Sequence, residues 1–334
     1  MRALYFKAPR QLEIRVEHLP ALIPGQVLVK TLVSAISPGT EMLVYRGEMP
    51  QDAPTDANIA ALAGEMRYPL KYGYAAVGQV IDIGDPTLAG WQNRIVFSFQ
   101  PHQTHFLAPP DHLIPLPEGI APEQGIFLPN METAVNFVMD GQPLLGERVA
   151  IFGQGIVGLL TTALLAQFPL AHLTTFDHFP LRRKASLDAG ANSSHSPDSL
   201  QAPLDSHKFP SYFDLTYELT GSPHALNDAI AVTGFDGRVV IGSWYGQKRA
   251  PLDLGGYFHR SRIRLISSQV STLAPQFTGR WDKARRFEMA WEMIRRVRPE
   301  RWITQEFSFE HAEGAYALID QKSETAIQVI LNYS

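Results

Sequence analysis

The sequence has no cysteine among its 334 residues. Disulfide bonds are therefore excluded, and so is every zinc or iron–sulfur site that relies on thiolate ligands. Any chemistry that this chain performs must proceed without a thiolate.

An excess of positive charge and a long hydrophobic run are also missing. Lys and Arg together number 29 against 33 Asp and Glu, a net charge of −4, which is too nearly neutral for the basic surface that nucleic-acid binding requires. The most apolar run, residues 155–166, contains two threonines and is shorter than the ~18–20 residues of a membrane span. The first residues carry regularly spaced charges, unlike a signal peptide. We expect a folded cytoplasmic protein with neither nucleic acid nor membrane as a partner.

Two patterns of hydrophobic residues divide the chain. Up to about Pro117, short apolar runs alternate with turn residues, which indicates a β-rich region. After Pro122, strand and helix patterns alternate, which predicts βαβ units around a parallel sheet. The expected strands cover residues 149–152, 172–176, 213–219, 238–241 and 262–266, and the expected helices cover residues 156–168, 182–189 and 223–233. In the tail we expect helices over 282–298 and 311–319 and strands over 303–309 and 326–331.

A glycine-rich loop follows the first strand of this α/β region. Gly153, Gly155 and Gly158 form the spacing G-x-G-x-x-G between a strand and a helix, which is suited to a dinucleotide pyrophosphate. The candidate cofactor-binding residues of this loop are Gly153, Gln154, Gly155, Ile156, Val157 and Gly158.

Asp177 lies 19 residues beyond Gly158, at the predicted end of the second strand. A carboxylate there accepts hydrogen bonds from the adenosine ribose and repels a 2′-phosphate, which favours NAD. Arg182, followed by Arg183 and Lys184, could instead hold that phosphate, so NADP stays open.

Three further motifs agree with a known family. Residues 24–30 (PGQVLVK), 72–78 (YGYAAVG) and 113–119 (LIPLPEG) resemble, in order and spacing, motifs of the medium-chain dehydrogenase/reductase superfamily, the alcohol dehydrogenase-like proteins. The resemblance implies an α/β protein with a GroES-like β-rich catalytic domain (residues 1–120 and 270–334) and a Rossmann domain with a doubly wound parallel sheet (residues 121–269). It also implies an NAD(P)-dependent oxidoreductase and a homodimer formed along residues 262–266.

The zinc ligands of that family are largely replaced. Ser37 and Tyr74 stand at the positions of a ligand cysteine and the ligand histidine, and Glu132 alone keeps a plausible ligand. Hydroxyl groups do not hold zinc as thiolate and imidazole do, so we expect a zinc-independent member. His102 and His105 are three residues apart on a predicted strand and point to opposite faces, so they do not form a substitute metal site.

Without zinc, the substrate would be polarised by hydrogen bonds alone. The candidate catalytic residues are Tyr74, Glu132 and Thr40, with Glu41 and a histidine such as His102 behind them. Each has a structural alternative: Tyr74 fills the space of an imidazole, Glu132 favours a helix dipole, and Thr40 and Glu41 cap a helix.

The substrate is expected to be a carbonyl or alcohol, or a conjugated enone or quinone. Aromatic residues near the expected cleft suit an aromatic or bulky apolar molecule, although core packing explains them equally well. They are Tyr45, Tyr68, Tyr72, Phe97, Phe99, Trp244 and Tyr245. The alternative function is a sensor or scaffold that binds a dinucleotide without catalysis.

Overall fold

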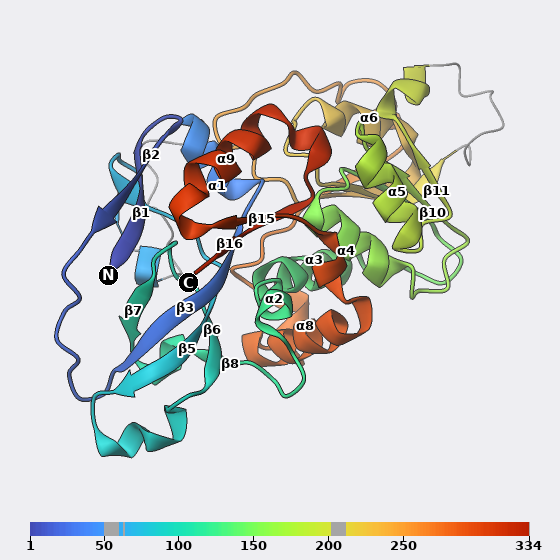
Figure 1. The fold of residues 1–334 in the computed structure, drawn as a ribbon. Helices are drawn as coiled ribbons and strands as arrows, with labels where there is room; N and C mark the ends of the chain where they lie inside the picture. Colours follow the sequence, from blue (N-terminus) through green and yellow to red (C-terminus); the bar gives the residue numbers. More distant parts are fainter. Residues whose placement is uncertain (50–59, 63, 202–211, 334) are drawn as a thin grey trace. The chain divides into compact units, whose positions relative to one another are not determined.

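The computed structural model describes residues 1–49, 60–62, 64–201 and 212–333. These residues form two compact units. The first contains Met1–Pro129 and Arg298–Ser334, and the second contains Asn130–Val297 (Figure 1). The mixed α/β class and the predicted division into a β-rich part and a parallel-sheet part are confirmed.

The first unit is built mainly from antiparallel strands. Its smaller sheet has the order β2-β1-β4, and its larger sheet has the order β15-β16-β3-β5-β6-β8, with β7 also paired to β3. The strands are β1 (Arg2–Ala8), β2 (Gln11–Val16), β3 (Val27–Ile36), β4 (Leu70–Lys71), β5 (Ala76–Ile83), β6 (Ile95–Ser98), β7 (His105–Ala108), β8 (Ile114–Pro115), β15 (Ile303–Ser308) and β16 (Gln328–Asn332). The helices are α1 (Thr40–Arg46), α2 (Pro122–Gly125) and α9 (Ala312–Gln321).

Strand β3 organises this unit. Val27, Val29, Thr31 and Val33 alternate toward the interior, as β-branched residues do in a half-buried strand. The strand ends at Ile36, and α1 begins four residues later. Helix α9 contacts α1 and packs Ala312, Ala315 and Tyr316 into the same core. The core around α1 therefore includes residues from near the C-terminal end of the chain.

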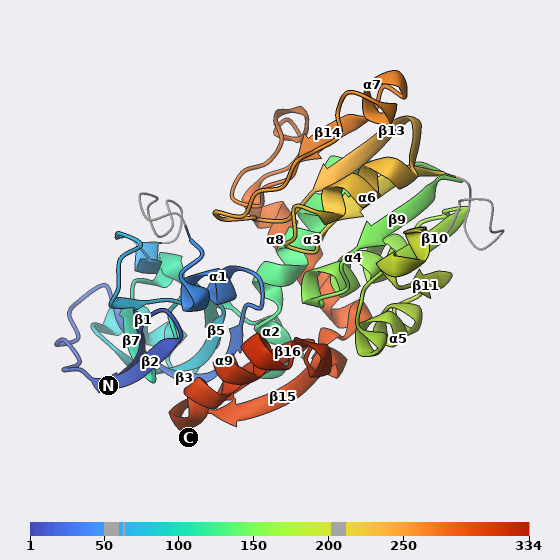
Figure 2. The same ribbon diagram turned by 90° about the horizontal axis from the view of Figure 1, so that it is seen from above.

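The second unit is a doubly wound Rossmann fold. Six parallel strands have the order β11-β10-β9-β12-β13-β14, so the strand order reverses between β9 and β12. Figure 2 labels β9, β10, β11, β13 and β14 of this sheet. The strands are β9 (Arg148–Phe152), β10 (His172–Phe176), β11 (Ser193–His195), β12 (Phe213–Glu218), β13 (Thr233–Ile241) and β14 (Arg264–Ser267). The helices are α3 (Leu128–Gly141), α4 (Ile156–Leu165), α5 (Pro180–Asp188), α6 (Ala225–Val232), α7 (Tyr257–Arg260) and α8 (Lys283–Val297).

Successive side chains of β9 pack on opposite faces of this sheet. Ala150 and Phe152 pack in one core cluster with residues of α6. Val149 and Ile151 pack in another with residues of α3 and α4. Both faces of the sheet are covered by helices. The strand is therefore apolar along its length, without alternating polar residues, as is typical of buried parallel strands.

Helix α8 belongs to the second unit, although the expected boundary at residue 270 would place it in the first. It packs against α4, and its Arg286 forms an ion pair with Glu132 of α3. No helix within the described residues is both long and apolar enough to cross a bilayer.

Candidate functional site

The glycine loop lies where β9 ends and α4 begins. Gly153 has a φ of +89°, and a Cβ there would lie 2.6 Å from the carbonyl oxygen of Leu219. At Gly158 a Cβ would lie 2.0 Å from the carbonyl oxygen of Gly153. These two positions require glycine because strand β12 and the loop itself pack against them.

Gly155 is a glycine for a different reason, because a Cβ there would meet no atom within 4 Å. The backbone N–H groups of Gly155, Ile156 and Val157 have no acceptor within the described part of the chain. They lie at the start of α4, a ten-residue helix whose dipole attracts an anion. The open side of the loop is therefore suited to a pyrophosphate.

The side chain of Gln154 stabilises the glycine loop itself and forms no part of its open side. Its side chain is fully buried, with Nε2 donating to the carbonyl of Gly153 and Oε1 accepting from the hydroxyl of Thr162. Its backbone N–H donates to Asp177 Oδ2 at 2.8 Å. The contacts of Gln154 thus hold the shape of the turn and join it to the end of β10.

Asp177 is 7% exposed and accepts a second backbone hydrogen bond, from Phe179 to Oδ1 at 2.8 Å. Each carboxylate oxygen keeps capacity for another donor, such as a ribose hydroxyl. The two nearby arginines already contact other groups of the protein. Arg183 Nη1 donates to the carbonyls of Asp177 and His178, and the guanidinium of Arg182 lies 4.9 Å from the ring centroid of Phe179.

In the first unit, the structure brings Ser37 and Tyr74 together. The Tyr74 hydroxyl donates to Ser37 Oγ at 2.6 Å, and both side chains are half-buried. Thr40 lies at the start of α1, and its N–H reaches Ser37 Oγ at a long 3.4 Å. Two of the residues expected from the zinc-ligand positions are therefore in direct contact, with Thr40 beside them.

Glu41 lies behind this pair and is completely buried. Its Oε1 accepts from the backbone N–H of Ser37 at 2.8 Å. Its Oε2 lies 2.9 Å from His102 Nε2 and accepts from the hydroxyl of Tyr316. Burial and the adjacent Glu41 raise the pKa of Tyr316 far above its ordinary value, so this hydroxyl stays a donor.

Sequence reasoning missed Tyr316, Ser34 and Tyr333, which complete the group. His102 Nδ1 lies 2.7 Å from Ser34 Oγ, which in turn lies 2.8 Å from the hydroxyl of Tyr333. Tyr316 is 275 residues from Glu41 and Tyr333 is 299 residues from Ser34. No local pattern could link them.

Glu132 of α3, in the second unit, forms a buried ion pair with Arg286 of α8. Arg286 Nη2 and Nε both donate to Oε1 of Glu132, at 2.7 and 3.0 Å. Burial raises the pKa of Glu132, an effect that Arg286 opposes. Arg286 was also missed by sequence reasoning, although a charged residue among the apolar positions of α8 was a visible signal.

Hydrogen bonds connect this ion pair to a set of further buried polar residues. Arg286 Nη1 donates to Asn136 Oδ1 at 2.7 Å, while Asn136 and Ser268 both donate to Asp140 Oδ2, at 2.9 and 2.6 Å. Burial raises the pKa of Asp140 and outweighs these two hydrogen bonds. The group therefore holds two carboxylates and one guanidinium away from water.

His102 and His105 have separate surroundings. His102 is buried and bonded as described above, whereas His105 is half-buried, with Nδ1 3.1 Å from Thr104 Oγ1. Burial and the positive charges of Lys30 and Arg2 lower the pKa of His105. Within the described residues, no three His, Asp or Glu side chains gather in a way that could hold a metal ion.

Three of the seven aromatic residues considered for a substrate pocket are buried in the first unit. Tyr45 and Tyr72 are in the hydrophobic core of the first unit, and Phe97 is fully buried. Trp244 is 44% exposed, and Tyr245 donates to Glu218 at 2.5 Å. Core packing thus accounts for Tyr45, Tyr72 and Phe97.

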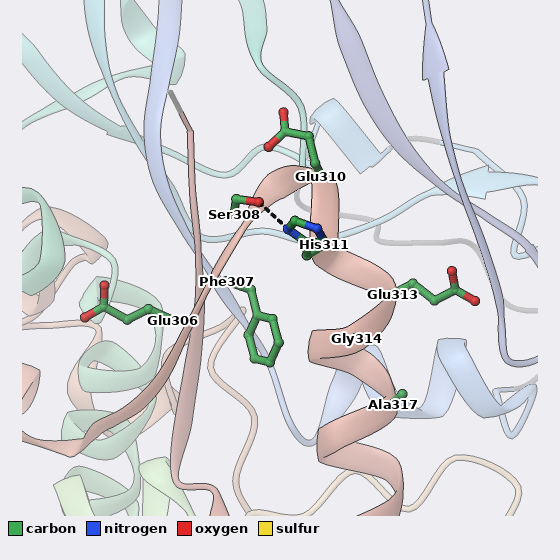
Figure 3. Close-up of a pocket in the computed structure, with 8 residues that line it drawn as sticks. All are labelled: Glu306, Phe307, Ser308, Glu310, His311, Glu313, Gly314 and Ala317. Carbon is green, nitrogen blue, oxygen red and sulfur yellow. Dashed lines mark hydrogen bonds between the residues drawn. The ribbon is translucent and has the colours of Figure 1, made fainter.

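A surface hollow of about 600 Å³ lies between the end of β15 and α9. Figure 3 shows the carboxylates of Glu306, Glu310 and Glu313 around it, with His311 Nδ1 2.8 Å from Ser308 Oγ. None of the expected site residues lines this acidic hollow.

No family model matches the sequence. Among curated proteins, the starvation-sensing protein RspB of Escherichia coli K12 is 21% identical over 363 residues, which cover all of both chains. (R,R)-Butanediol dehydrogenase of Bacillus subtilis is 25% identical over 269 residues, covering 69% of this chain and 74% of that protein.

Solved structures show the same fold. An alcohol dehydrogenase of E. coli CFT073 in complex with NADH has a TM-score of 0.77 at 17% identity, covering 99% of both chains. A Sinorhizobium meliloti structure described as a zinc-binding dehydrogenase and bound to NADP has a TM-score of 0.76 at 16% identity, covering 99% of this chain and 98% of that one. The full-length similarity to RspB, the order of the sheets and the glycine loop together support the medium-chain dehydrogenase/reductase superfamily, and the named relatives indicate a dehydrogenase of the alcohol dehydrogenase type.

Proposed function

We propose that the protein transfers hydride between NAD(H) and a small alcohol or carbonyl substrate, without zinc. The observation that carries this proposal is the loop at Gly155, which presents three N–H donors at the start of α4. It lies at the carboxyl end of β9, beside the point where the strand order reverses and where such folds bind dinucleotides. Structural neighbours that hold NADH and NADP support a nicotinamide dinucleotide.

The residues around the loop fit this cofactor. The N–H groups of Gly155, Ile156 and Val157 would hold the pyrophosphate, and Asp177 would accept from the adenosine ribose. The bound nicotinamide supplies or accepts the hydride. We favour NAD over NADP because the Asp177 carboxylate repels a 2′-phosphate, while Arg183 already donates to backbone carbonyls.

Zinc independence is supported by the groups at the former ligand positions. Ser37 Oγ is occupied by the Tyr74 hydroxyl, and neither hydroxyl is a good zinc ligand near neutral pH. Oε1 of Glu132 carries two hydrogen bonds from Arg286, a cation that a metal would have to displace. This donor set does not fit a catalytic zinc ion.

At the reacting end, we propose that the Ser37 and Tyr74 hydroxyls act as one unit. Tyr74 donates to Ser37, which leaves the Ser37 hydroxyl proton available for a substrate oxygen. Thr40 is a second hydroxyl next to this unit. In the second unit, both guanidinium bonds go to Oε1 of Glu132, so its Oε2 keeps the capacity to accept a further hydrogen bond.

The names of the relatives guide the choice of molecules to test. They include butanediol and sorbitol dehydrogenases, so diols and polyols join the carbonyl compounds, alcohols, enones and quinones expected from the sequence. We also propose that the working form is a homodimer in which β14 pairs with its copy, because β14 is the edge strand of the parallel sheet.

The decisive test of cofactor binding is Gly155→Ala. Its backbone lies in the extended region, at φ −66° and ψ −177°, and the added Cβ meets no protein atom, so the fold and the melting temperature should not change. The same methyl group occupies the space that a pyrophosphate needs. We expect NADH, measured by fluorescence titration, to bind at least about tenfold more weakly. Equal affinity in both proteins would place the dinucleotide elsewhere.

The test of catalysis uses a defined panel of substrates. The probes are (2R,3R)-butane-2,3-diol, sorbitol and benzyl alcohol with NAD⁺, and benzaldehyde and 9,10-phenanthrenequinone with NADH. Tyr74→Phe should lower turnover by about 10²–10³ while NADH affinity stays the same, because the cofactor is held elsewhere. A loss below about threefold would mean that Tyr74 only fills space. NADH binding with no turnover of any probe would favour the sensor or scaffold function.

A further inference from the structure

The Glu41 carboxylate is fully buried and receives donors from three separate parts of the first unit. They are the backbone N–H of Ser37 before α1, the ring of His102 before β7 and the hydroxyl of Tyr316 on α9. Burying an ionisable side chain is unfavourable unless it is fully hydrogen-bonded, and an apolar residue would fill the same volume without that requirement.

On one side, Glu41 holds Ser37. Its Oε1 bonds to the Ser37 N–H at 2.8 Å, and its own N–H donates to the Ser37 carbonyl at 3.2 Å. These two bonds close the five-residue turn between β3 and α1. Because Ser37 is the first residue beyond the strand, the direction of its hydroxyl depends on this turn.

On the other side, His102 holds Tyr74. A Cβ at Gly73 would lie only 2.7 Å from His102 Cδ2, so the backbone just before Tyr74 packs directly against the imidazole ring. Gly73 has a φ of +116°, a conformation that other residues rarely adopt. The position of the ring therefore constrains the backbone that leads into Tyr74.

The ring itself is fixed at both nitrogens. A carboxylate only accepts, so Nε2 carries the proton that bonds to Glu41. In the neutral ring, Nδ1 then accepts from Ser34, which accepts from Tyr333 in turn. Every donor of this chain has an acceptor, so the ring has one preferred orientation.

We propose that Glu41 and His102 are positioning residues that hold the Ser37–Tyr74 hydroxyl pair in its reactive geometry. Glu41 acts through the turn at Ser37, and His102 acts through the backbone at Gly73. Tyr316 is the distant residue that completes the carboxylate site. This inference rests on the proposed function, because the hydroxyl pair matters only if it faces a reacting substrate.

The experiment compares Glu41→Gln and Tyr316→Phe with a matched control, Tyr5→Phe. The Tyr5 hydroxyl on β1 donates to the carboxylate of Glu17, so the control also removes a tyrosine–carboxylate hydrogen bond from the first unit. Turnover of the five probes named above, the KM of each probe and the affinity for NADH are measured. We expect kcat to fall by about 10- to 100-fold in Glu41→Gln and less in Tyr316→Phe, with KM and NADH affinity within about threefold.

Combining each variant with Tyr74→Phe separates positioning from a general structural defect. If Glu41 acts through the hydroxyl pair, Glu41→Gln should cause little further loss once Tyr74 is already phenylalanine. Losses that multiply, or variants whose kcat matches the Tyr5→Phe control, overturn the inference. If Glu41→Gln does not fold, Tyr316→Phe alone decides the test. A wild-type protein that turns over none of the probes overturns the proposed function, and this inference with it.

Discussion

Arg286 and Glu132 form a buried ion pair in which Nη2 lies 2.7 Å from Oε1 and the two side chains are 1% and 5% exposed. The two residues come from α8 and α3 and are 154 residues apart. The carboxylate that the sequence suggested as a remaining zinc ligand thus carries a cation supplied by the protein. We expect the pair to affect both the stability of the second unit and its capacity to bind a metal ion.

The first prediction concerns stability. Arg286→Ala leaves the Glu132 carboxylate buried without its partner, and we expect a loss of about 3–5 kcal/mol in the free energy of unfolding, measured in urea. The control is Arg296→Ala on the same helix, whose ion pair with Glu292 is 2.8 Å long but exposed. That change should cost less than about 1 kcal/mol. Equal losses of unfolding free energy in the two variants would show that the buried ion pair stabilises the protein no more than the exposed one.

The second prediction concerns zinc. Elemental analysis of the purified protein should find no stoichiometric zinc, and a chelator should leave the melting temperature unchanged, because Ser37 and Tyr74 bond to each other and Glu132 bonds to Arg286. About one zinc per chain, removed by chelation together with turnover, would contradict this expectation.

The third prediction concerns the choice of cofactor. NADH should bind more tightly than NADPH, and Asp177→Ser should shift the ratio of the two dissociation constants by about tenfold or more toward NADPH, because a like-charge repulsion is removed. Asp188→Ser is the control, since it removes the same charge from an exposed position at the end of α5. A wild-type preference for NADPH would mean that the basic residues around Arg182 outweigh the carboxylate.

The fourth prediction concerns assembly. Strand β14 pairs only with β13 among the described strands, which leaves its other edge open to a second copy. Sedimentation at micromolar concentration should show a dimer. A monomer under these conditions would indicate that Arg264 and its neighbours protect a free edge instead.

The fifth prediction concerns pH. Burial raises the pKa of Asp140 in the folded protein, so folding favours its protonated form. The stabilising contribution of that form is complete below the unfolded-state pKa of about 3.9 and is lost as the pH rises through the folded-state pKa. Asp140→Asn should therefore raise the melting temperature at pH 7, with a difference that shrinks toward pH 4. The exposed Asp188→Asn should show no such trend, and a lowered melting temperature of Asp140→Asn at pH 7 would contradict the prediction.

Local patterns predicted much of the second unit. The strand over 149–152, the glycine loop and the helix from residue 156 lie within a few residues of one another, and the structure places them as expected. The reason is physical: apolar runs of strand length, the G-x-G-x-x-G spacing and the proline that follows the helix all act through neighbouring residues. The helix ends at Leu165, three residues earlier than expected, because frayed ends depend weakly on sequence.

What the sequence determined by itself is the kind of fold and the glycine loop. Only the tertiary structure decided which partners the predicted catalytic residues have. It pairs Glu132 with Arg286, joins Ser37 to Tyr74, and surrounds Glu41 with His102 and Tyr316. These partners come from distant segments, and a buried polar group must find its hydrogen bonds wherever the packed chain brings a partner within reach.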